Sequence, residues 1–306
     1  MQSLHYVSEE RIIMKNVTIA AIQMACNSIE PNTNIVKAES FVRAAKDKGA
    51  NIILLPELFE TKYFCQERNY EYYNMATDVD SNPAIKHFSK ICAELSVVMP
   101  ISFFEKSNNT TFNSIAMIDA DGSILGVYRK THIPDDHYYQ EKFYFTPGNT
   151  GFKVWDTAYG KVGVGICWDQ WFPEAARCMA LMGADILMYP TAIGSEPILE
   201  CDSQPHWRRV MQGHAAANII PVVAANRIGT EDVIPSNENG YQSSSLTFYG
   251  SSFITNETGE IIQQLDNKEE GFICSTVDLD SIRQLRLSWG LFRDRRPECY
   301  DYIHKA

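Results

Sequence analysis

The amino-acid sequence predicts an α/β protein built as a four-layer α-β-β-α sandwich of two mixed sheets. Each half of the chain has the order strand, helix, strand, helix, strand and hairpin, which indicates an internal pseudo-twofold repeat. The strands at 51–55, 185–189 and 221–226 are apolar throughout, as is typical of strands that are buried on both faces. Two stacked sheets, each with helices on its outer face, satisfy both observations.

Local signals place the elements of each half. In the first half we expect a strand, a helix, a strand, a helix and a DADG hairpin at 18–24, 32–49, 51–55, 81–96 and 113–130. Pro83 begins the second helix, and either Ser81 or Asn82 is its N-cap. In the second half we expect a strand, a helix, a strand, a helix and a strand at 161–167, 173–183, 185–189, 204–218 and 221–226, followed by a hairpin with an NETG turn at 250–265.

The repeat also helps to distinguish structural residues from functional ones. Gly49 and Gly183 end equivalent helices, and Pro56 and Pro190 follow equivalent strands. The next residue differs, because Glu57 in the first half corresponds to Thr191 in the second. Since an architectural residue would more plausibly recur, the sequence favours a functional role for Glu57.

Three reactive side chains follow apolar strands: Glu57, Lys130 and Cys167. Open α/β sheets keep their sites at the carboxyl ends of strands, so these residues are candidates for base, cation and nucleophile. Taken alone, a cysteine after VGVGI is more often a small buried hydrophobe, and Lys130 could simply end a hairpin. The turn after Cys167 leads into a helix, and such a strand-to-helix elbow favours a nucleophile.

The segments LLPELF, YRKTHIPDD and GVGICWDQWFPEAAR resemble the three signature segments of the nitrilase (carbon-nitrogen hydrolase) superfamily, and the match covers nearly the whole chain from Met14. The segments EKFYFTPG, YPTAIGSEP and FRDRRPECY are similar to its N-carbamoylputrescine amidase branch. The resemblance implies a catalytic triad of Glu57, Lys130 and Cys167, with Glu141 as a fourth polar member. It also implies hydrolysis of N-carbamoylputrescine to putrescine, carbon dioxide and ammonia. We expect the backbone N–H of Trp168 to help to bind the oxyanion.

A small cationic ureide needs a carboxylate at the far end of its pocket. Glu196 is the first candidate, and Asp135 and Asp136 are secondary ones, with a solvated loop as the alternative for the aspartates. Tyr63 and Tyr138 or Tyr139 are candidates to line the aliphatic part of the substrate, although aromatic residues near a pocket are as often packing residues.

Composition excludes several classes of function. The 306 residues include 27 Lys and Arg against 38 Asp and Glu, and the net charge of −11 argues against nucleic acid as a partner. No apolar run is long enough to span a membrane, and the first residues lack the features of a secretory signal. The eight cysteines form no CxxC pair, which favours reduced thiols in the cytoplasm. The histidine spacing predicts no metal site, and we expect no organic cofactor.

The predicted organisation is a short extension at 1–13 that is poorly ordered and a single domain at 14–306. Its C-terminal segment, 280–306, is rich in arginine and apolar residues, so we expect it to pack on a partner subunit of a homo-oligomer, with folding back on its own subunit as the alternative. Two other functions stay open. One is a related hydrolase of carbamoyl amino acids, such as β-ureidopropionate, or of simple amides, and the other is a non-catalytic assembly protein.

Overall fold

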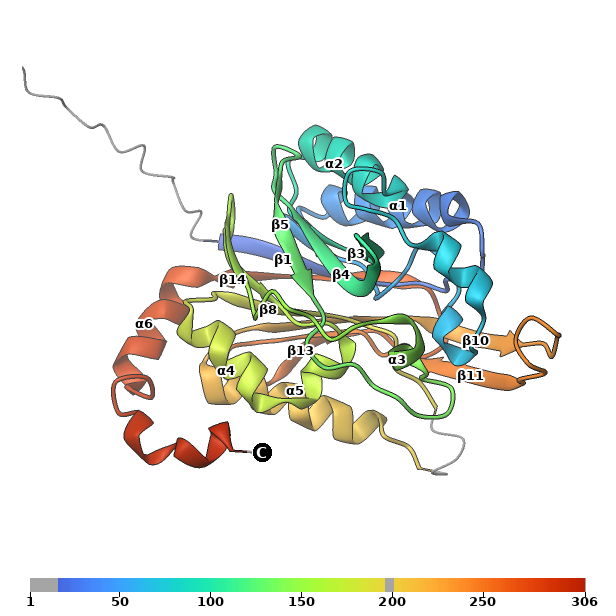
Figure 1. The fold of residues 1–306 in the computed structure, drawn as a ribbon. Helices are drawn as coiled ribbons and strands as arrows, with labels where there is room; N and C mark the ends of the chain where they lie inside the picture. Colours follow the sequence, from blue (N-terminus) through green and yellow to red (C-terminus); the bar gives the residue numbers. More distant parts are fainter. Residues whose placement is uncertain (1–15, 196–200, 306) are drawn as a thin grey trace, which may run out of the picture.

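The computed structural model describes residues 16–195 and 201–305, so the expected extension at 1–13 lies outside the described residues. Two sheets stack face to face, with α1 and α2 over one and α4 and α5 over the other (Figure 1). The predicted four-layer α-β-β-α sandwich is therefore confirmed. Among the described residues, no helix is both long enough and apolar enough to cross a bilayer.

The first sheet is assembled from two three-stranded pieces, β14-β1-β2 and β3-β4-β5. A parallel bridge between Ile52 and Val98 joins them, and the N–H of Ile53 donates to the carbonyl of Val98 at 3.0 Å. The strands are β1 (Asn16–Gln23), β2 (Ile52–Leu54), β3 (Met99–Ser107), β4 (Thr110–Ile118), β5 (Ile124–Arg129) and β14 (Gly271–Asp278).

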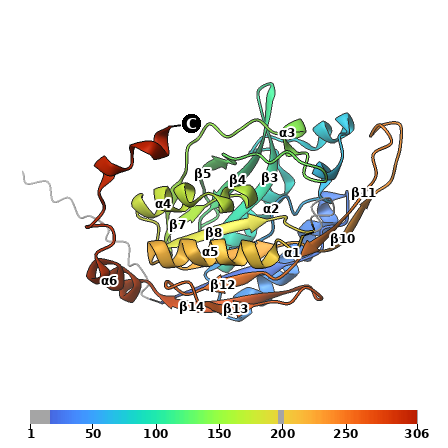
Figure 2. The same cartoon turned by 90° about the horizontal axis from the view of Figure 1, so that it is seen from below.

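The second sheet has the order β13-β12-β9-β8-β7-β6. The two sheets have the same strand order if β7, β8, β9, β12 and β13 are taken as the equivalents of β1, β2, β3, β4 and β5. This correspondence fits the repeat that the sequence indicates. Its strands are β6 (Val154–Thr157), β7 (Gly160–Val164), β8 (Ile186–Thr191), β9 (Val222–Asn226), β12 (Phe253–Thr255) and β13 (Ile261–Gln264). A separate hairpin, β10 (Ile228–Val233) and β11 (Ser244–Tyr249), extends from the body (Figures 1 and 2).

Alternate strand residues face opposite layers, which is why these strands are apolar on both faces. In β1, Val17, Ile19 and Ala21 pack between the sheets, whereas Ala20 and Ile22 pack under α1 and α2. The helices are α1 (Pro31–Asp47), α2 (Pro83–Leu95), α3 (Glu141–Tyr144), α4 (Pro173–Leu181), α5 (Gln204–Asn218) and α6 (Leu279–Trp289). Short 3-10 turns complete the fold: η1 (Phe64–Gln66), η2 (Tyr70–Met75), η3 (Cys167–Trp171), η4 (Pro297–Cys299) and η5 (Asp301–His304).

Helix ends follow the local signals of the sequence. Of the two candidate caps of α2, the structure uses Asn82, whose side-chain oxygen accepts from the N–H of Ile85 at 2.8 Å. Gly49 and Gly183 have φ angles of 89° and 94°, and their N–H groups bond the last carbonyls of α1 and α4. Both helices therefore end in the same way and lead directly into the equivalent strands β2 and β8.

Candidate active site

The strand ends place three candidate side chains at one edge of the sandwich. Glu57 comes shortly after β2, Lys130 directly after β5, and Cys167 opens the turn η3 after β7. Cys167 has a φ of 41° and Leu58, the residue after Glu57, a φ of 48°, both in the left-handed region that non-glycine residues seldom adopt. Backbone strain of this kind is frequent at functional sites.

Lys130 joins two carboxylates in the interior. Its Nζ donates to Glu57 Oε1 at 2.8 Å and to Glu141 Oε2 at 2.6 Å, and none of the three residues is exposed to solvent. Burial by itself lowers the pKa of Lys130, but the charges of Glu141 and Glu57 raise it well above its usual value. Burial raises the pKa of Glu141 to about 7, against the opposing effect of Lys130. Lys130 therefore remains a fixed cation within the site.

Asn113, in β4, connects the same groups. Its Nδ2 donates to Glu57 Oε1 at 2.7 Å and to Glu141 Oε2 at 3.5 Å, and its backbone oxygen accepts from the N–H of Lys130 at 2.8 Å. Glu57 Oε1 is thus bonded twice, whereas Oε2 of the same carboxylate is buried without a hydrogen-bond partner among the described residues. One oxygen of Glu57 anchors the carboxylate, and the other is left to take a proton.

The thiol of Cys167 lies in the electrostatic field of these groups. Burial raises its pKa well above the usual value, the Glu57 carboxylate raises it further, and Lys130 lowers it. A backbone hydrogen bond from Ala192, just after β8, also lowers the pKa. The effect of Lys130 on the pKa of the thiol is outweighed by burial and by the two carboxylates. The resting thiol is therefore neutral, and a base would be needed to convert it to a thiolate.

Asp169 ties the cysteine turn to the lysine strand. Its Oδ2 accepts from the N–H of Ile166 at 2.9 Å and from the hydroxyl of Tyr128 in β5 at 2.7 Å. Its Oδ1 accepts from the N–H of His132 at 3.0 Å. This buried carboxylate thereby binds a side chain before Lys130 and a backbone N–H after it, and so connects both sides of Lys130 to the turn that carries Cys167.

The remaining predicted residues surround this cluster at different depths. Tyr63 is buried and its hydroxyl donates to Glu141 Oε1 at 2.8 Å. The ring of Tyr139 lies 6.0 Å from that of Tyr63, and its hydroxyl accepts from the N–H of Gly194 at 2.9 Å. Trp168 has an exposed side chain, and its N–H belongs to the first turn of η3, where helical N–H groups lack intrahelical acceptors.

Of the carboxylates predicted for the far end of the substrate, the structure describes only Asp135 and Asp136, and these lie outside the cluster. Asp135 and Asp136 are exposed, and they line a surface cavity of about 590 Å³ with Arg68, Gln140 and other residues. Glu196 lies outside the described residues, directly after Ser195, whose carbonyl accepts from the hydroxyl of Tyr139 at 3.4 Å. Within 16–195 and 201–305, no group of three His, Cys, Asp or Glu residues is arranged to hold a metal.

Sequence reasoning missed Asn113 and Asp169. A signal for Asn113 was present, since it is a polar residue just before the apolar run IAMI in a hairpin that ends at Lys130. Asp169 stands two residues after Cys167 in CWD, where its proximity to a candidate nucleophile was a hint. What the sequence does not show is that both side chains turn inward to bind groups from distant strands.

Comparisons with known proteins agree with this geometry. The family model described as carbon-nitrogen hydrolase matches residues 18–287. An N-carbamoylputrescine amidase from Solanum tuberosum is 55% identical over 288 residues, 94% of each chain. A citrullinase from Francisella tularensis is 54% identical over 291 residues, 95% of this chain and 99% of its own. The crystal structure of a carbon-nitrogen hydrolase from Helicobacter pylori superposes with a TM-score of 0.85 at 36% identity and covers 95% of this chain and 99% of that one.

Replacing Asn113 by leucine is expected to lower kcat for an amide or ureide substrate by roughly 10- to 100-fold, since a hydrogen bond to a charged group contributes about 1.5–3 kcal/mol. The measurement is steady-state kinetics together with thermal unfolding. Asn51→Leu is the matched control, because the Asn51 side chain accepts from Thr18 N at 2.9 Å at the amino end of β2, away from the site. An Asn113→Leu enzyme with undiminished kcat would show that Asn113 has no influence on the reaction.

Proposed function

The chain belongs to the carbon-nitrogen hydrolase family, and on this premise we propose that it hydrolyses the ureido group of N-carbamoylputrescine to putrescine, carbon dioxide and ammonia. The main support is the 55% identity to an N-carbamoylputrescine amidase over 94% of both chains. Enzymes of this family are hydrolases of carbon–nitrogen bonds other than peptide bonds. The buried cluster around Lys130 supports a thiol mechanism for that chemistry.

We propose that Cys167 is the nucleophile and Glu57 its base. The ureido carbonyl is a poor electrophile because two nitrogens share their lone pairs with it, and the thiol is neutral at rest. Glu57 Oε2 is therefore suited to take the thiol proton as sulfur bonds to the carbonyl carbon, and then to deliver this proton to the nitrogen that leaves. Proton removal and attack are coupled, so the thiol becomes reactive only when a substrate is present.

The tetrahedral intermediate carries an oxyanion that needs fixed donors. In this proposal Lys130 and the N–H of Trp168 bind it, and each such donor is worth roughly 10²–10³ in rate in other enzymes. Glu141 keeps Lys130 oriented through the bond of 2.6 Å. Because Lys130 is held by two carboxylates, its charge is already in place when the oxyanion forms.

Hydrolysis of the thioester completes the cycle. Glu57, having given its proton to the departing amine, accepts a proton from water, and the hydroxide attacks the thioester carbonyl and releases the Cys167 thiolate, which recovers the proton. The carbamic acid product breaks down to carbon dioxide and an amine. This scheme balances whether the diamine or ammonia leaves first, since either order gives the same three products.

The ammonium of the substrate requires a carboxylate at the far end of the pocket. We propose Glu196 for this role, with Asp135 and Asp136 as secondary candidates. The support for Glu196 is its position in the chain, directly after Gly194 and Ser195. Both of these residues are hydrogen-bonded to the hydroxyl of Tyr139, and the ring of Tyr139 lies next to that of Tyr63. Tyr63 and Tyr139 are proposed to flank the aliphatic part of the substrate.

A second candidate substrate is citrulline. A citrullinase is 54% identical over 95% of this chain, almost the same as the amidase. Citrulline has the same ureido group and differs from N-carbamoylputrescine by a carboxylate beside the ammonium, so it would need a cation that the diamine ureide does not. Arg68 lines the cavity next to Asp135 and Asp136 and is a cation that such a zwitterionic end could use. A carbamoyl-β-amino acid, which has a carboxylate and no ammonium, fits the acidic candidates least.

A cytoplasmic location and a homo-oligomeric assembly are further parts of the proposal. All eight cysteines are free thiols in the structure, and a nucleophilic thiol stays reduced in the cytoplasm. For assembly we propose that two copies pack through the face formed by α4, α5 and the C-terminal segment. This face has an apolar groove of about 1000 Å³, lined by residues such as Leu291 and Ile303. The buried Nη1 of Arg177 in the groove has no partner among the described residues, which a partner subunit could supply.

Cys167→Ala is expected to abolish turnover while it leaves the unfolding temperature nearly unchanged, because the turn geometry does not depend on the sulfur atom. Cys201→Ala, at an exposed cysteine, is the control and should keep full activity. Rapid quenching of the active enzyme with substrate, followed by intact-protein and peptide mass spectrometry, should locate an acyl adduct on Cys167. Hydrolysis at the wild-type rate by Cys167→Ala would reject this nucleophile.

The substrate is tested with a panel of N-carbamoylputrescine, L-citrulline, N-carbamoyl-β-alanine and the neutral ureide N-butylurea. We expect the highest kcat/KM for N-carbamoylputrescine. Glu196→Ala should lower kcat/KM for this substrate by about 2–5 kcal/mol in transition-state free energy and barely change it for N-butylurea. A preference for citrulline would replace the proposed substrate, and an equal loss for the charged and neutral ureides would reject Glu196 as the ammonium site.

Oligomer assembly is tested by light scattering on the purified chain. Leu181→Glu places a charge on the half-exposed face of α4 and is expected to lower the mass in solution to that of a monomer. Val36→Glu, at another exposed apolar residue on α1, is the control and should leave the mass unchanged. A wild-type chain that is already monomeric at micromolar concentration would contradict the proposed assembly.

A further inference from the structure

A buried ion pair behind the site takes no part in the chemistry described above. Arg227, between β9 and β10, is fully buried, and Glu231 in β10 is 6% exposed. Arg227 Nη1 donates to Glu231 Oε1 at 3.1 Å. Burying such a pair is costly unless its remaining polar atoms are also bonded, so the partners of these atoms indicate what the pair does.

The other N–H groups of Arg227 bind the backbone of the proposed base. Nε donates to the carbonyl of Glu57 at 3.1 Å, and Nη2 donates to the carbonyl of Leu58. Leu58 is the residue with a φ of 48°, and its own N–H donates to Ser102 Oγ at 2.9 Å. The guanidinium therefore holds the strained turn that points the Glu57 side chain at Lys130.

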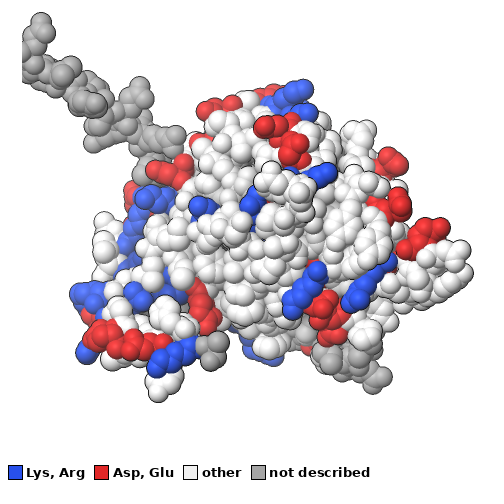
Figure 3. Space-filling model, viewed as in Figure 1, with Lys and Arg blue, Asp and Glu red and all other residues white. Residues whose placement is uncertain are grey.

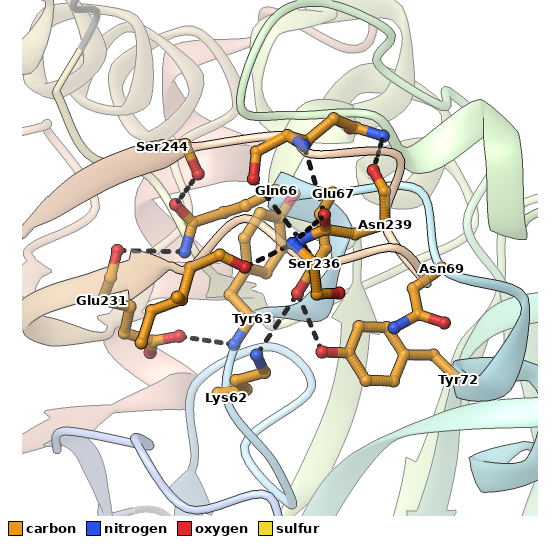
Figure 4. Close-up of polar contacts among 12 residues, drawn as sticks. Lys62, Tyr63, Gln66, Glu67, Asn69, Tyr72, Glu231, Ser236, Asn239 and Ser244 are labelled. Atoms are coloured by element: carbon orange, nitrogen blue, oxygen red, sulfur yellow. Dashed lines mark hydrogen bonds and ion pairs between the residues drawn. The ribbon is translucent and has the colours of Figure 1, made fainter.

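The other oxygen of Glu231 leads to the second carboxylate of the site. Oε2 accepts from the N–H of Tyr63 at 2.6 Å, and the hydroxyl of Tyr63 donates to Glu141 Oε1 at 2.8 Å. Figure 4 shows Glu231 beside Tyr63, within a polar network that also contains Gln66 and Glu67. Gln66 Nε2 donates to the backbone oxygen of Glu231 at 3.2 Å, which fixes the Tyr63 segment against β10.

We propose that Arg227 and Glu231 are positioning residues that hold Glu57 and Glu141 at the separation that Lys130 spans. Two carboxylates around one ammonium repel each other, so their spacing must be imposed by the surrounding structure. Arg227 holds the backbone of Glu57, and Glu231 holds Glu141 through Tyr63. The ion pair between them joins both connections into one unit. This inference rests on the proposed function of Glu57, Glu141 and Lys130.

The β10–β11 hairpin reinforces the Tyr63 segment from its other end. Asn239 Nδ2, in the hairpin loop, donates to Glu67 Oε2 at 2.6 Å, and Glu67 Oε1 accepts from Tyr72 at 2.8 Å and from Lys62 at 3.3 Å (Figure 4). Ser244 Oγ in β11 donates to Gln66 Oε1 at 2.9 Å. The segment that carries Tyr63 is therefore bound to the hairpin at several points, and Glu231 is the contact nearest to the site.

The test substitutes Glu231 by glutamine. Both carboxylate oxygens accept from buried donors, and the amide nitrogen of glutamine must face one of these donors, so one of the two connections is lost. We expect kcat to fall about tenfold or more while KM changes by less than about threefold, because the loss concerns the reacting groups and not the binding of the substrate.

The pH profile separates positioning from general destabilisation. The charged or titratable groups that face Glu141 are Lys130, Glu57, Tyr63, Cys65 and Cys167. The Tyr63 hydroxyl lowers the pKa of Glu141, so weakening this bond raises that pKa. Activity needs the ionised carboxylate and is lost as pH falls through its pKa. The acid limb of kcat should therefore move to higher pH in Glu231→Gln and in Tyr63→Phe.

Asp185→Asn is the matched control. Asp185 is 4% exposed, and its carboxylate accepts from Arg283 Nε at 2.9 Å, from Arg283 Nη2 at 2.6 Å and from the N–H of Lys161 at 3.0 Å, at the amino end of β8. In this variant too, the amide nitrogen must face a hydrogen-bond donor, but at a position away from the site. The unfolding temperature should therefore fall, and the pH profile of kcat should stay unchanged. If Glu231→Gln loses only as much activity as this control, the proposal is overturned.

Coupling to Tyr63 gives the decisive result. If Glu231 acts on Glu141 through Tyr63, its substitution should lower kcat much less in a Tyr63→Phe background than in the wild type. Independent, multiplicative losses would overturn the connection. Glu231→Asp, which keeps the charge but is one methylene shorter, replaces Glu231→Gln in the cycle if that variant does not fold.

A wild-type enzyme that hydrolyses no ureide would contradict the proposed function, whereas an active wild type with unaffected variants would contradict only the positioning.

Discussion

The buried ammonium of Lys130 is the group on which the rest of the site depends. It lies between Glu57 and Glu141 without solvent contact, and its two bonds of 2.8 and 2.6 Å compensate for the loss of hydration. Removing one partner from such a group typically costs about 3–5 kcal/mol, so the three side chains form one electrostatic unit. The two oxygens of Glu57 also differ, because the bonds to Lys130 and Asn113 both use Oε1, and Oε2 has no hydrogen-bond partner among the described residues.

The two stacked sheets are needed to assemble this unit. Asn113 lies in β4 and Lys130 directly follows β5 in the first sheet, while Cys167 lies in a turn of the second. Asp169 binds the turn to Tyr128 in β5 of the first sheet and to the N–H of His132 in the loop that follows β5. Because each contact joins segments that are far apart in the chain, the geometry of the site depends on the packing of the whole sandwich.

The environment of the thiol explains how such an enzyme avoids side reactions. Many reactive cysteines are thiolates at rest, but burial and the neighbouring carboxylates raise the pKa of Cys167. A neutral thiol reacts slowly with incidental electrophiles. In the proposed mechanism, the thiol becomes nucleophilic only when a carbonyl is bound beside Glu57, which couples activation to substrate recognition.

The sequence by itself determined the layers, the strand ends and the candidates that follow them. Apolar strands and capped helices are local patterns. They predict the sandwich, and the positions at which the strands end indicate Glu57, Lys130 and Cys167 as candidates. Only the tertiary structure decided that Asn113 bridges the carboxylates, that Asn82 and not Ser81 caps α2, and that Arg227 and Glu231 bind the backbones of Glu57 and Tyr63. The physical reason is that hydrogen-bond partners 56 or 170 residues apart produce no periodic pattern in the sequence. The pKa of the thiol likewise depends on burial, which arises only when the layers pack.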